Sequence, residues 1–544
     1  MSLTSGIDSS HSLGVNLFRF PHPFMEDTPR SLLEIRMCAL SAAIREKADW
    51  HIKFRDEKIR ANWAGEIRGQ LTDNMINYVM TELEAYATLR DEITGIEPSP
   101  YERIWRSDRL IPSALKAELL SAIAPLESVP DAEKDWHPGS DGKVLDLVHS
   151  SLYPIVYGRT ISTSGELVQP RDDDAFDGGI EPTFTSERFQ WLPSDFDVAD
   201  DGTVSLRSPY INNVHPDDYA ALEKVILKVL ERAVPMFEWV LSDLARERQL
   251  PTRMDLKGRK FLGCISEDGQ ELRPKDEETA AIEAEARALA GADYGQQYEY
   301  NLRLLQDWYG NQQQTWPDSK PAYDGGLDEE KKTVSLRGKT LQVIVKAANI
   351  VLTPGNPKYA GGKWHVKTIV STFIYYYDST VSAIRMGLTG PCILILGMGH
   401  HSGDRCVQEV VKVITKEDRC IAFPNFYQHL VSPFRLAYPT RLGHRKIVLF
   451  LLVDPLITIP SASVVAPQQA SRTRRTVAGT ALWKRLPVEL QDMIMGYADP
   501  MTLEQAKAYR EELMAERTKT FVETVDEQRF GHEFNMWCYT ARIY

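Results

Sequence analysis

The sequence predicts an α+β protein with a β core of the barrel or jelly-roll type and helices before and after it along the chain. Apolar residues recur with a helical period over residues 28–87 and alternate with a period of two over residues 333–459. The helical pattern returns after Leu486. Because the strand-like runs follow one another at short spacing, an antiparallel barrel or jelly roll is favoured over a parallel sheet with crossover helices.

Length and composition are those of an ordinary globular protein. The 544 residues include 43% hydrophobic and 26% charged residues, and this length allows roughly two to four domains. A formal net charge of −13 argues against a general nucleic-acid binder, whose contact surface is basic. The six cysteines form no C-x-x-C pair, so neither a zinc module nor a disulfide framework is expected.

The N-terminal residues lack the basic head, apolar run and small-residue cleavage site of a secretory signal peptide. The two most apolar stretches, residues 387–399 and 447–459, are shorter than the ~20 residues that a membrane helix needs, so we expect them to be buried strands. We therefore expect an intracellular protein, cytoplasmic or nuclear, with no membrane and no nucleic acid among its partners. A small-molecule or protein substrate of unknown identity is expected instead, and the oligomeric state is left open.

The N-terminal half is predicted to be mainly helical. Thr28-Pro29 is expected to start a helix whose apolar face carries Leu33, Met37, Leu40 and Ile44. His215-Pro216 opens a later helix, which Pro235 is expected to kink or end. Residues 276–290 form an acidic, alanine-rich helix with little apolar face, which we expect on the surface.

Changes in pattern divide the chain into four predicted regions. They are an N-terminal helical region (1–130), a mixed helical and irregular region packing on the core (131–330), the β core with the candidate site (331–465), and a C-terminal linker with helices (466–544). In the last region, Thr502 and Gln505 form a capping box that opens a long charged helix.

The candidate site consists of two histidines and an arginine in the β core. His365 in GGKWHVK and His429 in NFYQHLVSPFR precede Arg445 in GHRK. Two histidines and a carboxylate hold Fe(II) in oxygenases and leave positions open for substrate and oxygen. An arginine beyond the second histidine binds the far carboxylate of 2-oxoglutarate in a bidentate way that lysine does not match. The carboxylate expected two residues after His365 is absent, because Lys367 stands there.

Long segments of the chain resemble one family. They are DWHPGSDGKVLDLVHSSLYPIVYGRT, SPYINNVHP, LRGKTLQVIVKAANIVLTP, GGKWHV, IVSTFIYYYDS, CIAFPNFYQHLVSPFRLAYPTRLGHRKIVLFLLVDP and LPVELQDMI. The family is the mainly fungal domain of unknown function 4246, and the resemblance covers nearly the whole chain. It is similar to the Fe(II)/2-oxoglutarate-dependent oxygenases. The resemblance implies a double-stranded β-helix (jelly-roll) core with Fe(II) bound by His365 and His429 and 2-oxoglutarate bound by Arg445.

A tyrosine is predicted to help bind the cosubstrate. Tyr375, Tyr376 and Tyr377 alternate between strand faces, so one or two can line the interior and donate a hydroxyl, and we select Tyr375. Aromatic core packing is the competing explanation for all three.

Two assignments in the β core stay open between several residues. Arg435 or Arg441 could replace Arg445 as the arginine that binds 2-oxoglutarate. Asp378 or Asp404 could supply the carboxylate that Lys367 lacks, although acids at a strand end or in a loop are more often simply solvated.

Three hypotheses for function follow. The chain is an active oxygenase, a catalytically inactive oxygenase-like binding or scaffold protein, or a metal-free barrel enzyme that uses Lys367 as base or nucleophile. An ammonium group beside a divalent cation repels it. We therefore expect weak Fe(II) binding and little 2-oxoglutarate turnover, and we expect His365, His429 and Arg445 to meet at one end of the same cavity.

Overall fold

The computed structural model describes residues 30–69, 71–101, 103–170, 186–246, 251–255, 274–311, 318–327, 329, 332–361, 369–380, 384–391, 407–425 and 427–519. The chain forms two compact units, Ser31–Ala85 with Leu250–Leu327, and Met1–Arg30 with Tyr86–Gln249 and Asp328–Tyr544. Residues 86–249 and 328–544, which the sequence prediction assigned to different regions, thus belong to one unit. In the described part of the chain, no helix has the length and apolarity needed to cross a membrane.

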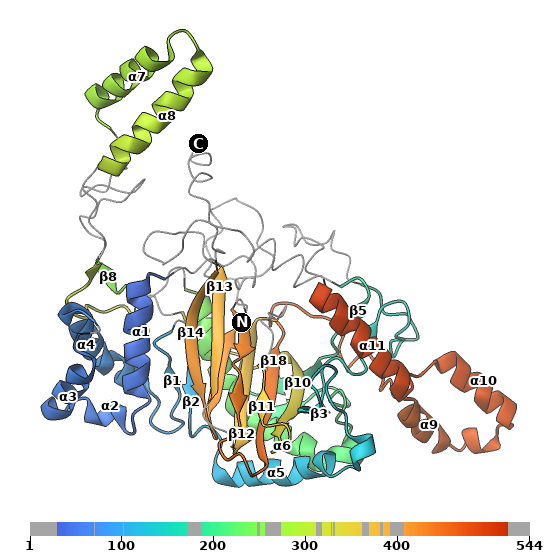
Figure 1. Cartoon of the computed structure of the whole chain (residues 1–544). Helices are drawn as coiled ribbons and strands as arrows, with labels where there is room; N and C mark the ends of the chain where they lie inside the picture. Colours follow the sequence, from blue (N-terminus) through green and yellow to red (C-terminus); the bar gives the residue numbers. More distant parts are fainter. Residues whose placement is uncertain are drawn as a thin grey trace. The chain divides into compact units, whose positions relative to one another are not determined.

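The smaller unit is mainly helical and contains the hairpin of α7 and α8 (Figure 1). Its elements are α1 (Leu32–Arg45), α2 (Trp50–Lys53), α3 (Glu57–Ile67), most of α4 (Asp73–Leu89), β8 (Met254–Asp255), α7 (Asp276–Ala290), α8 (Tyr294–Asn311) and β9 (Asp318–Ser319). The cap of α1 is Ser31, whose hydroxyl accepts from the backbone N–H of Glu34. Thr28, the predicted cap, lies outside the described residues. Ala286 is the only residue of α7 that is buried, which confirms the predicted surface helix.

The larger unit combines long strands with helices. Its helices are α5 (Ser113–Glu127), η1 (Asp131–Glu133), α6 (Pro216–Leu244), α9 (Ala470–Ala478), η4 (Trp483–Arg485), α10 (Val488–Ala498) and α11 (Leu503–Glu516). Its strands in the first half of the chain are β1 (Glu97–Pro98), β2 (Trp105–Ser107), β3 (Val144–Val148), β4 (Ile155–Val156), β5 (Phe189–Gln190), β6 (Ser194–Val198) and β7 (Val204–Leu206).

Apolar runs in the sequence predicted most, but not all, of the strands described in the second half of the chain. These strands are β10 (Lys339–Leu352), β11 (Lys358–Tyr359), β12 (Ser371–Ser379), β13 (Ile384–Pro391), β14 (Val407–Thr415), β15 (Cys420–Pro424), β16 (Gln428–Val431), β17 (Phe434–Arg435) and β18 (Gly443–Leu452). The prediction of a mixed helix and sheet fold with strands clustered after residue 333 is therefore confirmed.

One large antiparallel sheet organises this unit. Its strand order is β1-β2-β15-β12-β18-β10-β6-β7, and β3 pairs with β10. A second sheet has the order β14-β13-β16, and β11 pairs with β17. Five strands of the large sheet come from residues 97–206, where the sequence analysis expected helices and irregular structure. These strands are two to five residues long, too short for a periodic signal.

Helix α6 covers one face of the large sheet and contacts β12 and β15. The ring of Phe237 lies 6.3 Å from that of Phe373 on β12, and α6 begins where His215 caps it. Pro235 does not end α6, which runs on to Leu244. Burial of thirteen of its side chains, rather than local propensity, sustains the helix past the proline.

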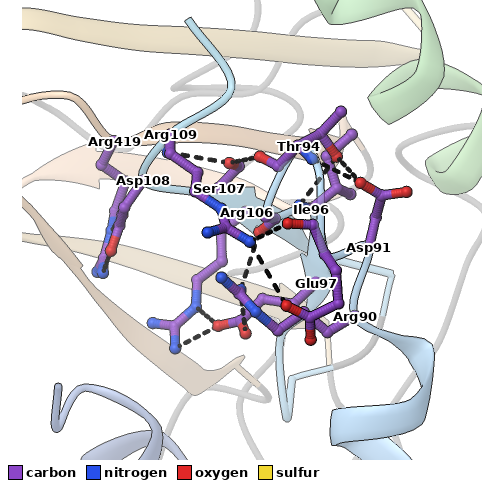
Figure 2. Close-up of polar contacts among 12 residues, drawn as sticks. Arg90, Asp91, Thr94, Ile96, Glu97, Arg106, Ser107, Asp108, Arg109 and Arg419 are labelled. Carbon is purple, nitrogen blue, oxygen red and sulfur yellow. Dashed lines mark hydrogen bonds and ion pairs between the residues drawn. The ribbon is translucent and has the colours of Figure 1, made fainter. Parts of the chain in front are cut away.

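Ion pairs fix the edge of the large sheet where β2 meets β15 (Figure 2). The carboxylate of Glu97 accepts hydrogen bonds from Arg90 and Arg106, each at 2.9 Å. Asp108 faces Arg419, which donates to both carboxylate oxygens at 2.6 and 2.8 Å. Burial alone raises the pKa of Asp108, but the hydrogen bonds and charges of Arg419 and a neighbouring lysine outweigh it and lower that pKa. Two short strands far apart in sequence are held together in this way.

Candidate carboxylate and metal sites

Arg445 is a buried cation at the beginning of β18, with 3% of its surface exposed. Its guanidinium carbon lies 4.3 Å from the ring centroid of Tyr376. Nη2 donates to the hydroxyl of Thr415 at 2.5 Å. Among the described residues, Nη1 has no hydrogen-bond partner. The geometry therefore leaves one donor edge of a buried guanidinium for an acceptor that the described protein does not supply.

The electrostatics of Arg445 lead to the same conclusion. Desolvation lowers its pKa, and contacts with Tyr376 and Tyr359 only partly offset that effect. Burial in turn raises the pKa of Tyr376, so its hydroxyl stays neutral. No carboxylate in the described part of the chain forms an ion pair with Arg445. A buried cation is costly unless an anion or hydrogen bonds compensate it, so this position suits the carboxylate of a ligand.

Strand alternation explains which way Arg445 points. The next residue, Lys446, donates to Glu127 of α5 at 3.0 Å and so lies on the helix-covered face. Arg445 therefore lies on the opposite face, together with its β10 register partner Ile350. The predicted position of Arg445 near the start of the last apolar strand is correct.

Tyr375, the tyrosine selected from the sequence, lies on the other face of β12 from the tyrosine that contacts Arg445. Tyr375 is the register partner of Val448, on the helix-covered face of β18, and its ring lies 6.2 Å from that of Tyr377. The hydroxyl of Tyr377 donates to Asn349 at 3.3 Å. Tyr375 and Tyr377 thus lie on the helix-covered face, and Tyr376 is the tyrosine beside Arg445. The alternation was predicted, and a role of Tyr375 in cosubstrate binding stays a prediction.

His429 lies on β16, where Leu388 of β13 is its register partner. It is buried, and its ring is 5.2 Å from that of Phe423 in an edge-on arrangement. His365 and Lys367 lie outside the described residues, so the expected meeting of His365 with His429 stays a prediction. Asp404, one of the two substitute carboxylates, also lies outside the described residues.

Asp378, the other substitute carboxylate, already has partners. It lies 2.9 Å from Nε2 of His444 and 3.5 Å from Nζ of Lys446. A carboxylate engaged by two basic side chains is a poor candidate for a metal ligand. The structure gives no support to Asp378 as the missing acid.

A cluster that the sequence analysis missed brings His137, Asp146 and His149 together, with ligand atoms within 4.8 Å of one another. Nδ1 of His137 lies 2.7 Å from Asp146, and Nε2 of His149 lies 3.8 Å from the same oxygen. The side chain of Asp146 is fully buried on β3. The motif could have been noticed in WHPGSDGKVLDLVHSS, but no strand pattern there indicated that the three side chains converge.

The hydrogen bonds of this cluster do not fit a metal ion. The backbone N–H of Ser151 donates to Nδ1 of His149 at 3.2 Å, so a neutral His149 carries its proton on Nε2. A metal at Nε2 needs that nitrogen unprotonated. Arg510 also lies 3.9 Å from Asp146, and burial lowers the pKa of His149 well below its usual value. The cluster is therefore a hydrogen-bonded network around a buried carboxylate.

Comparisons with protein families give matches over most of the chain. The family described as "Protein of unknown function (DUF4246)" matches residues 73–386 and 390–476. The family described as "Domain of unknown function DUF4246, N-terminal" matches residues 10–66. No curated protein matches the chain.

Three solved structures share short stretches of similarity with the chain. IDO from Bacillus thuringiensis is 13% identical over 22% of this chain and 47% of its own, with a TM-score of 0.16. The Fe(II)/(alpha)ketoglutarate-dependent dioxygenase TqaL is 11% identical over 32% and 57%, with a TM-score of 0.17. A bsmA homologue from Methylobium petroleophilum is 10% identical over 23% and 45%, with a TM-score of 0.16. The chain spans about half the length of these proteins, and scores this low carry no argument about fold.

Proposed function

The chain belongs to the DUF4246 family, and from this premise we propose that it is a protein of the Fe(II)/2-oxoglutarate-dependent oxygenase type that binds 2-oxoglutarate at Arg445. The observation that carries the proposal is the free Nη1 edge of this buried arginine, held by Tyr376 and Thr415. A bidentate pair with a carboxylate satisfies both its charge and its geometry. The substrate to be oxidised is unknown.

The strand order supports a double-stranded β-helix core for this function. Along the chain, β10, β12, β15 and β18 enter the large sheet. The intervening strands β11, β13, β14, β16 and β17 pair only with one another in the described residues. Repeated crossing between two antiparallel sheets is how a jelly roll is wound. Arg445 and His429 are then contributed by the two opposite sheets.

The residues present fit a bound iron less well than they fit bound 2-oxoglutarate. His429 is the one candidate ligand in the described part of the chain, His365 would be the second, and Lys367 replaces the acid that the resemblance implies. Bound iron supplies oxygen activation in this class of enzymes. With one acid missing, no catalytic step through iron follows from these residues. The residues around Arg445 bind and orient the 2-oxo acid and exclude water from its far carboxylate.

Anaerobic calorimetric titration with 2-oxoglutarate tests the proposal. The variant Arg445→Met should lose affinity by a factor of about 10–100, because a charged hydrogen-bond partner is removed from a buried site. Arg435→Met is the matched control, since Arg435 is exposed on β17 and was another candidate for the 2-oxoglutarate arginine. Equal affinity of the wild type and Arg445→Met would reject the site, and a loss confined to Arg435→Met would transfer it to that residue.

A binding protein without turnover is the second candidate, and Lys367 favours it. We expect little succinate from the chain as it stands, because a cation replaces a ligand that supplied negative charge. Lys367→Glu should raise succinate formation only in part. Strong succinate formation by the unchanged chain that depends on both His365 and His429 would show that it is an active oxygenase after all.

A further inference from the structure

Helix α10 carries an exposed apolar face. Four apolar residues recur at positions i, i+3, i+4 and i+7 and therefore share one side of the helix. They are Leu490, Met493, Ile494 and Tyr497, which we call the α10 stripe. A surface helix normally turns such a stripe towards the core. Here each of the four side chains is exposed to solvent, from 41% for Ile494 to 79% for Tyr497.

Exposed apolar residues are concentrated around this helix. Of the eighteen large apolar side chains that are exposed in the described residues, seven lie between residues 482 and 503. Single exposed apolar residues are normal on a protein surface, whereas a contiguous exposed patch usually marks a contact surface. The segment around α10 therefore has the composition of an interface.

Within its own chain, α10 has little packing to support its helical form. It has eleven residues, and none of its described side chains is buried. The side chain of Gln491 donates to the backbone carbonyls of Trp483 and Leu486, which ties α10 to η4. Isolated helices shorter than ~12–15 residues are marginal in water, and packing supplies most of the stability of a helix in a protein. A partner that covers the α10 stripe supplies that packing.

The charges at the two ends of α10 have opposite signs. Lys484 and Arg485 precede the helix, are exposed and form no ion pair with a described residue. Asp499 and Glu504 follow it. Asp499 pairs with Arg159 of the same chain at 3.0 Å, whereas Glu504 is exposed and forms no ion pair with a described residue. The helix dipole adds partial positive charge at the first end and partial negative charge at the second.

The α10 stripe is complementary to itself when two copies of the helix run antiparallel. Leu490 then lies against Tyr497 of the second copy, and Met493 lies against Ile494 of the second copy. Such an isologous contact closes as a twofold dimer, which is the commonest form of homo-oligomer.

The end charges favour the same orientation. In the antiparallel pair, Lys484 and Arg485 of one copy lie near Glu504 of the other copy, and the two helix dipoles oppose each other. In a parallel pair, each of these charges meets its own copy and repels it.

We propose that the α10 stripe is the contact surface of a dimer, in which α10 packs antiparallel to α10 of a second copy of this chain. The proposal goes beyond the proposed function and does not depend on it. A membrane surface fits less well, because the polar positions of α10 carry Glu489 and Asp492, whereas helices that lie on membranes carry lysine and arginine there.

Sedimentation equilibrium of the full chain over a range of concentrations tests the proposal. One helix pair buries less than the ~800 Å² per partner of a standard interface, so we expect a reversible dimer with a dissociation constant of about 10–100 µM. Ile494→Lys places a charge at the centre of the stripe and should weaken the dimer about tenfold or more. Val488→Lys is the matched control. Val488 is 65% exposed on the same helix but lies off the stripe, so this variant should dimerise like the wild type.

Cysteine variants test the orientation of the two helices. Ile494 lies near the twofold axis of the antiparallel pair, so Ile494→Cys should form an intermolecular disulfide under mild oxidation. Tyr497→Cys should not, because an antiparallel partner places the two cysteines farther apart than the ~7 Å between Cα atoms that a disulfide spans. Efficient cross-linking of both variants would show parallel helices and overturn the proposal.

A charge exchange gives a further readout. Lys484→Glu combined with Arg485→Glu should weaken the dimer about fivefold at low salt, and adding Glu504→Lys should restore part of the loss. A further loss on adding Glu504→Lys would contradict the antiparallel arrangement.

Three results of the sedimentation experiment would overturn the proposal. They are a wild type that stays monomeric up to about 0.5 mM, a dimer that Ile494→Lys leaves unchanged, and a dimer that Val488→Lys weakens as much as Ile494→Lys does. Circular dichroism of each variant establishes that it is folded. A monomeric wild type whose binding to phosphatidylserine vesicles is lost in Ile494→Lys would assign the stripe to a membrane surface and would also overturn the proposal.

Discussion

Adjacent side chains on one strand lie on opposite faces of the sheet and make different contacts in this protein. On β18, Arg445 faces the candidate carboxylate site whereas Lys446 pairs with Glu127 of α5. On β12, Tyr376 contacts Arg445 and Tyr375 packs under the helices. Both faces of these strands are covered, so both carry bulky residues, and hydrophobicity does not distinguish them.

Replacing Tyr376 tests its contact with Arg445. Tyr376→Leu should lower 2-oxoglutarate affinity roughly fivefold, because the guanidinium loses the aromatic face that positions it. Tyr376→Phe keeps the ring and should stay close to the wild type. Calorimetric titration measures both. Equal losses in the two variants would assign the effect to the hydroxyl group instead.

The network of His137, Asp146 and His149 makes a prediction about metals. Any change in melting temperature that Co(II) causes in the wild type should persist in His149→Gln, because His149 offers no free lone pair to a metal. The measurement is a thermal scan with Co(II) and with a chelator. If the Co(II) effect vanished in His149→Gln, the cluster would be a metal site.

At the scale of elements, buried ion pairs join strands that are distant in sequence. β2 and β15 are register partners over residues 105–107 and 420–422. Arg419 connects them because it donates to Asp108 and also to the backbone carbonyl of Ile414 at 2.7 Å. Its side chain is 1% exposed. Breaking such a pair leaves buried polar groups without partners.

Arg419→Met should destabilise the larger unit by about 3 kcal/mol, a value reduced from that of a fully buried pair because Asp108 is partly exposed. Arg207→Met is the matched control, since Arg207 and Asp197 form an exposed pair, and it should cost less than about 1 kcal/mol. Urea unfolding of the full chain measures both variants. Equal, small costs would mean that the edge pair does not hold the sheet.

At the scale of the whole molecule, stability should fall as the solution becomes acidic. His149 has a folded pKa well below that of the unfolded chain, where it is about 6.5. As the pH falls, the unfolded state therefore binds a proton on His149 before the folded state does. The stabilisation that neutral His149 gives above pH 6.5 is lost as the pH falls below 6.5. Asp146 and Asp108 have lowered pKa values in the folded protein. Their protonation therefore reduces the stability of the fold further, but only below about pH 4.

Unfolding free energies measured from about pH 7 to pH 5.5 should decrease by about 1 kcal/mol through His149. In His149→Gln this decrease should be smaller by that amount, because glutamine accepts a hydrogen bond without titrating. An identical pH dependence in the wild type and the variant would show that His149 is protonated equally in both states.

Much of the secondary structure followed from local patterns. Thr502 and Gln505 form the predicted capping box at the start of α11, and β10, β12, β15 and β18 appear where period-two alternation placed them. Of the two outcomes expected at Pro235, a kink or an end of the helix, the end does not occur, because tertiary burial of α6 outweighs one proline. The short strands β1, β2 and β3 were missed because they depend on their partners in the sheet rather than on their own sequence.

The sequence by itself determined the caps of α6 and α11, the alternation of the strands and the position of Arg445 at the start of β18, because each depends on residues close together in the chain. Only the tertiary structure decided that Tyr376 and not Tyr375 accompanies Arg445, and that Asp146 of β3 pairs in register with Ala348 of β10. Those relations depend on strand register across about 200 residues of chain. No local pattern specifies which of two covered faces a side chain meets, so this part of the site required the folded sheet.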